Sequence, residues 1–163
     1  KDMRYVGGCV RCVSGTATND VEASGFDKTK LAEADKTDDD VQFHCTPLYR
    51  SHRGKKFEWG HGYSVFTCVL RPLSKGSVKL ANDGSRRNVE IDYNFFAHSH
   101  DQQTLVEGVK KARQILASSE FDHLRGEEMA PGKEVQTDAQ ILEYLRRTAS
   151  TVYHPVGTCK MVP

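Results

Sequence analysis

Strand-like and helix-like segments occupy different parts of this sequence. Apolar and polar residues alternate over Val41–Thr46, and Tyr63–Leu70 is rich in β-branched and aromatic residues. Both patterns are typical of β-strands. Shorter strands are predicted at Val21–Phe26, Ser77–Leu80 and Asn88–Asp92. Since helical patterns follow only after these segments, the sequence predicts an α+β fold with antiparallel strands.

Two helices are predicted in the second half of the chain. Leu105, Val109, Ala112 and Leu116 recur at helical spacing, which predicts a helix over residues 101–118. A second helix is predicted over residues 137–146. Each has the form of a capping box at its start, Ser99 with Gln102 and Thr137 with Gln140. The charged residues 27–40 lack a period and predict a surface loop with at most one helical turn.

Length and charge exclude several classes of protein. The 163 residues, 37% of them hydrophobic, fit one globular domain with a core. A formal net charge of +1 argues against binding to nucleic acid or to an acidic membrane surface. No apolar run is long enough for a transmembrane helix, and no signal peptide opens the chain. We therefore expect a cytoplasmic protein, with membrane association left open for a longer parent; the oligomeric state is not predicted.

The cysteines and a small histidine cluster carry weaker signals. Cys45, Cys68 and Cys159 stand singly and are interpreted as reduced thiols of an intracellular protein. Cys9 and Cys12 form a lone CxxC on a possible strand, which leaves a redox or zinc protein as an alternative. Zinc needs four ligands, and no second pair completes the set. The run from His98 to Asp101 is interpreted as a helix entry, so no metal site is predicted.

Five segments resemble one known family in order and spacing. The end of the chain, Thr151-Val152-Tyr153-His154-Pro155-Val156-Gly157-Thr158-Cys159-Lys160-Met161, resembles the histidine motif of glucose-methanol-choline (GMC) flavin oxidoreductases. Residues 70–80 are similar to that family's Pro-x-Ser-(Arg/Lys)-Gly-x-Val-x-Leu signature. Residues 91–96 are similar to its Ile-Asp-Pro-Asn-Tyr segment, with Tyr93 in place of proline. Residues 18–26 and 40–44 resemble the choline-dehydrogenase-like branch.

The resemblance implies that residues 1–163 form the substrate-binding domain of a flavoenzyme. In the family, an antiparallel sheet forms one wall of an alcohol pocket, helices pack on its outer face, and an FAD-binding domain closes the other side. That domain is expected to be missing here, because Gly60-His61-Gly62 does not complete a GxGxxG fingerprint. The isolated chain is therefore expected to bind no FAD and to be inactive. A stand-alone module that binds a small ligand is the alternative.

His154 is the candidate catalytic base. In the family, the matching histidine takes the proton from the alcohol hydroxyl while the hydride goes to N5 of FAD. Histidine suits this task because its unperturbed pKa is about 6.5, and a positioned base contributes about 10²- to 10⁴-fold in rate. Pro155 biases the preceding backbone toward an extended conformation, and Gly157 allows close passage beside a cofactor. Pro155, Gly157 and Thr158 are the candidate cofactor contacts; the alternative for His154 is a surface histidine before a turn.

Two further residues are candidates for binding the alcohol. His44 lies on the polar side of the strand at 41–46, where the resemblance implies a hydrogen bond to the substrate oxygen; an exposed strand histidine is the alternative. Glu22 matches an acid that faces the cationic head of choline, although the family also carries it in enzymes for neutral alcohols. Trp59 and Tyr63 could form an aromatic cage for such a cation or belong to the core.

Overall fold

The structure is a computed structural model, and it describes part of the chain. The described residues are 4–6, 23–46, 50–51, 56–57, 62–82, 84, 88–158 and 161. Several sequence predictions lie outside these residues, namely those on Cys9, Cys12, Glu22, Trp59 and Cys159 and on the possible strand at 9–13.

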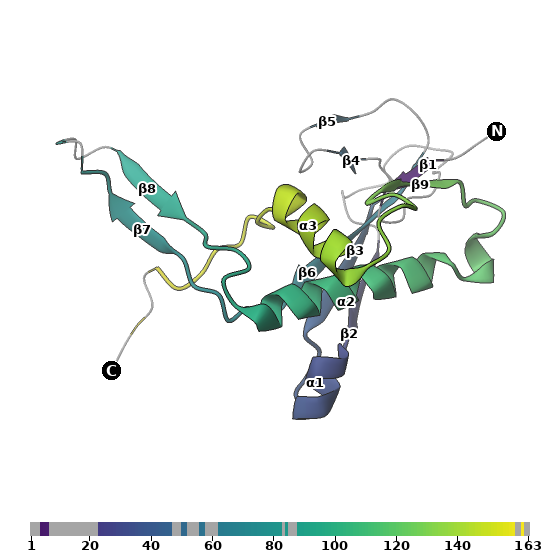
Figure 1. The fold of residues 1–163 in the computed structure, drawn as a ribbon, viewed down its shortest axis with the longest axis horizontal. Coiled ribbons are helices and arrows are strands. Elements are labelled where there is room, and N and C mark those ends of the chain that lie inside the picture. The colour runs from purple at the N-terminus through teal and green to yellow at the C-terminus, as the bar shows by residue number, and fades with distance from the viewer. Residues whose placement is uncertain are drawn as a thin grey trace.

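The main sheet has five strands and mixed pairing (Figure 1). Across the sheet the order is β2 (Ala23–Asp27), β3 (Val41–Thr46), β6 (Ser64–Val69), β1 (Arg4–Val6) and β9 (Glu127–Ala130). The β2–β3–β6 part is antiparallel, which confirms the predicted α+β fold. The parallel pairing of β1 with β6 and with β9 was not predicted. The sequence Glu-Glu-Met-Ala of β9 has no alternation that would reveal a strand.

Two smaller ladders accompany the main sheet. One pairs β4 (Arg50–Ser51) with β5 (Lys56–Phe57). The other is an antiparallel hairpin of β7 (Ser77–Leu80) and β8 (Val89–Asp92), so both strands predicted there are confirmed. This hairpin forms its own two-stranded sheet and projects away from the body of the molecule (Figure 1).

Three α-helices and one 3-10 turn complete the described structure. They are α1 (Lys30–Asp35), α2 (Ser99–Leu116), η1 (Ser119–Phe121) and α3 (Asp138–Thr148). The two predicted helices are therefore confirmed as α2 and α3. The predicted loop at 27–40 contains the six-residue α1, in which the hydroxyl of Thr29 caps the helix by accepting the N–H of Ala32.

The two predicted helix starts had different outcomes. The capping box of α3 is present, with Thr137 and Gln140 each accepting a backbone N–H of the other. The capping box predicted for α2 was wrong, because the helix begins one residue earlier. His98 is its N-cap, and the ring nitrogen Nδ1 accepts the N–H of His100. A histidine side chain thus makes the N-cap hydrogen bond that Ser, Thr, Asp or Asn side chains make more often.

The core lies between the sheet and α2. Val41 and Phe43 of β3 and Val65 of β6 pack against Ala112 and Leu116 of α2, with Cys45 beside them. A second cluster joins α2 to α3 through Leu105, Val106, Val109, Ile141 and Leu145. Each fully buried side chain of this kind stabilises the fold by about 1.5–3 kcal/mol. Helix α2 thus covers the sheet, and α3 packs on α2 (Figure 1).

Candidate functional site

His44 lies on the sheet face that points away from α2. Alternate residues of a strand point to opposite faces, and Phe43 on one side of His44 is buried in the core against α2. The register places His44 between Ser24 of β2 and Phe66 of β6. Both His44 and Phe66 are half-buried. The structure therefore places His44 on the side of β3 opposite the core, as predicted, and adds Phe66 of the next strand as an aromatic neighbour that was not predicted.

Tyr63 belongs to the core. Its side chain is 5% exposed, lies in the cluster that faces α2, and stacks on Phe121 with ring centroids 5.7 Å apart. Of the two roles considered for Tyr63, the aromatic cage is therefore wrong and the core position is correct.

The two described cysteines are free and half-buried. Cys45 packs against the core cluster, and Cys68 lies on β6 across from Gln42. Burial in these surroundings raises the pKa of both thiols. A raised pKa keeps the thiol protonated and unreactive, so both behave as small structural residues.

His154 lies in an exposed segment that leaves the end of α3. The helix ends at Thr148, and the next residues up to Thr158 form no helix or strand. Tyr153 has φ 65° and donates its N–H to the hydroxyl of Thr151 at 3.0 Å. His154 and Pro155 are both exposed, and so are the other two predicted cofactor contacts, Gly157 and Thr158.

Gly157 shapes the end of this segment. Its φ of 98° lies in the left-handed region that favours glycine, and no atom lies within 4 Å of the position where a Cβ would stand. The backbone beside His154 therefore turns in open space, where a flat molecule could lie against it. The exposed backbone and imidazole of this segment leave room for a flat ring beside them.

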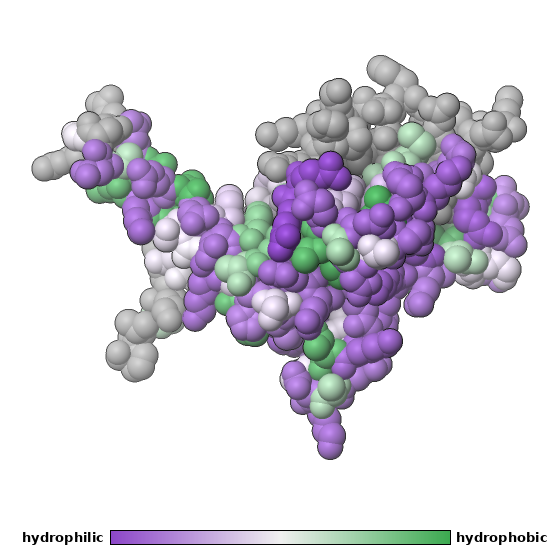
Figure 2. Space-filling model, in the orientation of Figure 1, coloured by the Kyte–Doolittle hydropathy of each residue, from purple (hydrophilic) through white to green (hydrophobic). Residues whose placement is uncertain are grey.

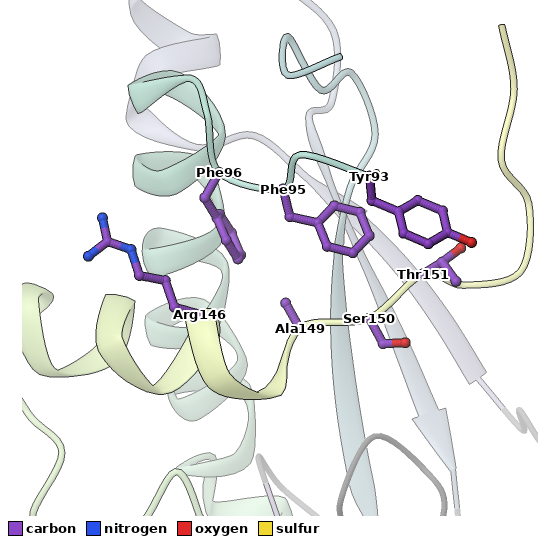
Figure 3. Close-up of a pocket in the computed structure, with 7 residues that line it drawn as sticks. All are labelled: Tyr93, Phe95, Phe96, Arg146, Ala149, Ser150 and Thr151. Carbon is purple, nitrogen blue, oxygen red and sulfur yellow. The ribbon is translucent and has the colours of Figure 1, made fainter. Parts of the chain in front are cut away.

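A cavity of about 340 Å³ lies directly before this segment (Figure 3). The rings of Tyr93 and Phe95 stack with centroids 5.1 Å apart and form one side of it. Phe96 and Arg146 lie at its other end, and the backbone of Ala149–Thr151 crosses it. No predicted site residue lines this cavity. The unusual Tyr93 in the second family-like segment was the available sequence signal, because an aromatic side chain there replaces a proline.

The candidate residues belong to two different elements of the fold. Within the described ranges, no hydrogen bond or ion pair joins His154 to His44. His44 is held by the sheet, whereas His154 is held only by the chain that follows α3. Glu22, the third candidate, lies outside the described residues.

A network of hydrogen bonds fixes the base of the β7–β8 hairpin to the start of α2. The buried carboxylate of Asp101 accepts the N–H groups of Leu73 and Ser74, each at 2.8 Å. The hydroxyl of Ser74 accepts the N–H of His98 at 3.0 Å. Asn94, in the left-handed region with φ 48°, donates its side-chain amide to the carbonyl of Lys75 at 3.0 Å. The two segments that resembled family signatures therefore meet in one structural joint.

The network also sets the ionisation of Asp101. Burial alone would raise the pKa of this carboxyl, but hydrogen bonds from the Ser74 side chain and from the N–H groups of Leu73 and Ser74, together with the nearby His100 ring, outweigh it and lower the pKa. Because the folded-state pKa is below the unfolded value of about 3.9, the carboxylate stabilises the fold fully above that pH. This stabilisation is lost as the pH falls through the folded-state pKa.

Replacing Asp101 by asparagine is expected to lower the free energy of unfolding by about 2 kcal/mol at neutral pH, the size of a charge-assisted hydrogen bond. The difference from the unmodified chain should shrink below about pH 4, where the native carboxyl also becomes protonated. Urea unfolding at several pH values measures this. Asp35→Asn, on the exposed surface of α1, is the matched control. A difference for Asp101→Asn that stays constant down to the acid range would contradict the assignment.

The histidines at the start of α2 have a structural role at the helix N-terminus. His98 caps the helix, and Nδ1 of His100 lies 3.6 Å from a carboxylate oxygen of Asp101. Within the part of the chain that the structure describes, no group of three or more His, Cys, Asp or Glu side chains is placed to hold a metal ion. The same described residues contain no helix long and apolar enough to span a bilayer.

Comparison with known proteins assigns the family. The C-terminal family model of the GMC oxidoreductases matches residues 72–163, more than half of the chain. The chain belongs to the GMC oxidoreductase family. The matched range includes the hairpin joint, helices α2 and α3 and the segment that carries His154.

Individual GMC relatives agree with this assignment. Oxygen-dependent choline dehydrogenase 1 of Chromohalobacter salexigens is 33% identical over 145 residues, which cover 89% of this chain and 25% of that protein. The oxygen-dependent choline dehydrogenase of Pseudomonas aeruginosa is 34% identical over the same shares. The chain thus spans about a quarter of the length of these curated relatives.

A solved structure has the same fold. The crystal structure of pyridoxine 4-oxidase from Mesorbium loti is similar with a TM-score of 0.73 over 94% of this chain and 31% of that one. The sequence identity is 21%, so this likeness concerns the fold alone. It extends the match from the C-terminal GMC range to nearly the whole chain, including the strands before residue 72.

Proposed function

We propose that this chain forms the substrate-side wall of a flavin-dependent alcohol oxidoreductase and works together with an FAD-binding domain. The observation that carries the proposal is the GMC family match over residues 72–163, which ends in the segment that presents His154. The relatives it resembles are named as choline dehydrogenases, which supports an alcohol as the substrate class. Without a flavin-binding domain we expect residues 1–163 to turn over nothing.

His154 takes the hydroxyl proton of the alcohol in this proposal. Bound FAD supplies the acceptor for the hydride that leaves the carbinol carbon. An alcohol hydroxyl is too weak an acid to ionise alone at neutral pH, so a base must accept its proton as the carbonyl forms. The exposed imidazole of His154 can reach a molecule that lies against residues 152–158. Pro155, Gly157 and Thr158 would border the flavin on that side.

His44 orients the substrate in this proposal. As a neutral imidazole it can donate one N–H to the alcohol oxygen, and its place on a paired strand fixes its direction. Phe66, directly across from it on β6, adds an apolar surface to the same wall. A pocket that combines apolar walls with a few placed polar groups is typical of small-molecule sites.

Glu22 selects among alcohols in this proposal. A carboxylate attracts a quaternary ammonium group by charge and gives a neutral alcohol no such gain. Choline is therefore the first substrate to test, beside a neutral primary alcohol.

The test uses a polypeptide that carries this chain together with a flavin-binding domain. Anaerobic addition of choline, or of benzyl alcohol, is expected to bleach the visible absorption of the bound flavin. Glu22→Gln is expected to raise the KM for choline several-fold and to leave the KM for benzyl alcohol unchanged. A flavin that neither alcohol reduces would refute the proposal. Saturable ligand binding by residues 1–163 alone, without flavin, would favour a stand-alone binding module.

A further inference from the structure

The β7–β8 hairpin has one apolar and one polar face. Residues directly opposite each other on antiparallel strands share a face, and Val78 pairs with Ile91 while Leu80 pairs with Val89. These four side chains form what we call the hairpin face. The pairs Lys79–Glu90 and Ser77–Asp92 point to the other side, where opposite charges are matched and water can solvate them.

The hairpin face is exposed to an unusual degree. Val78 and Val89 are each 51% exposed, Ile91 is 59% exposed and Leu80 is 65% exposed. Apolar side chains gather along the projecting hairpin in the surface view (Figure 2). A two-stranded hairpin is marginally stable in water by itself, and exposed apolar patches of this kind mark interaction sites.

The apolar surface continues from the hairpin to the histidine segment. After Ile91, the alternate residues Tyr93 and Phe95 are 45% and 47% exposed and line the cavity whose floor is Ala149–Thr151. Beyond that floor, Val152 is 50%, Tyr153 80% and Val156 92% exposed. The cavity thus lies between the residues that directly follow β8 of the hairpin and the start of the segment that carries His154 (Figure 3).

We propose that the hairpin face docks onto the flavin-binding domain that completes the enzyme. The inference rests on the proposed function, in which a flavin lies against the His154 segment. A domain that brings the flavin there also meets the adjoining aromatic cavity and, beyond it, the hairpin. The curated relatives are about four times as long as the part of this chain that matches them, since that part covers 25% of each, so they contain ample additional chain to cover this surface. A second copy of the chain is the competing occupant.

Cross-linking in the two-domain protein tests the docking. A benzophenone side chain replaces Leu80 on the hairpin face or, as the matched control, Glu90 on the polar face. Irradiation is expected to join position 80 to a peptide of the flavin-binding domain in the same polypeptide, identified by mass spectrometry, and to leave position 90 unjoined. Cross-links from position 80 to a second copy, or equal yields from both positions, would overturn the proposal.

A second measurement is needed in case the benzophenone side chain distorts the hairpin. Leu80→Lys puts a charge on the hairpin face and is expected to increase amide hydrogen exchange in β7 and β8 of the two-domain protein, whereas Lys79→Ala is expected to change nothing. Unchanged exchange in Leu80→Lys would count against docking. Failure of the proposed function looks different: the flavin would stay oxidised in the presence of alcohol while the cross-link from position 80 still formed.

Discussion

Replacing His154 by alanine is expected to slow reduction of the flavin by alcohol about 10²- to 10⁴-fold, the usual contribution of a positioned base. The visible spectrum of the bound flavin should stay the same, because the imidazole is exposed and its removal leaves no buried cavity. Stopped-flow mixing of the two-domain protein with alcohol, in the absence of oxygen, measures the rate. The substitution should lower the limiting rate constant of flavin reduction more than it changes the alcohol concentration that gives half of that rate.

A matched histidine provides the control for this experiment. His123 is also exposed and follows η1, at the other end of α2 from the hairpin joint. His123→Ala should leave the rate of flavin reduction unchanged. A His154→Ala protein that reduces its flavin as fast as the unmodified protein would show that the proton leaves the substrate by another route.

Replacing Gly76 by alanine is expected to disrupt the base of the β7–β8 hairpin. An added Cβ would stand 2.0 Å from the carbonyl oxygen of Asp92 and 2.9 Å from two backbone atoms of Tyr93. Backbone atoms cannot rotate away as a flexible side chain does, so the two segments must separate. Overpacking costs about 1–3 kcal/mol in general, and we expect the upper end here. Thermal unfolding measures the loss.

Gly25, in strand β2, provides the control for the loss of backbone freedom. At Gly25 the closest atom to an added Cβ is Cδ2 of Phe43, at 4.0 Å, an ordinary contact. Gly25→Ala should therefore unfold at nearly the same temperature as the unmodified protein. Equal effects of both substitutions would mean that the backbone of Asp92 and Tyr93 moves away from an added Cβ at position 76 without loss of stability. Gly76 would then serve some other purpose.

Elements with a strong local signal were predicted well. The structure places β3 at Val41–Thr46, the range over which apolar and polar residues alternate. Helix α3 begins after Thr137, where the sequence contains a capping box. In each case the residues that identify the element also supply the local interaction that fixes its boundary, so little depends on distant parts of the chain.

Elements that depend on tertiary contacts were missed or misplaced. Strand β9 is a strand because β1 pairs with it, and its own residues carry no alternation. The N-cap of α2 is His98 and not Ser99, because the imidazole reaches the N–H of His100. The hairpin of β7 and β8 was predicted as two strands, but alternation within a strand does not show which sheet the strand joins.

The residue types of the candidate site could be predicted from the sequence better than their arrangement in space. His44 on a polar strand face followed from alternation, and the structure has it there. The roles of His154, Pro155, Gly157 and Thr158 remain predictions, supported by the exposure of their segment. The cavity at Tyr93 and Phe95 could not be foreseen, because it is made by bringing the end of α3 beside a loop some fifty positions earlier in the sequence.

The position of the core has a practical consequence for anyone who wishes to produce this region by itself. The family match starts at residue 72, whereas β3 and β6, which cover the apolar side of α2, come before it. A polypeptide trimmed to the matched range would expose Ala112 and Leu116 to solvent and would tend to aggregate. The range matched by the family model is therefore shorter than the range that the core needs.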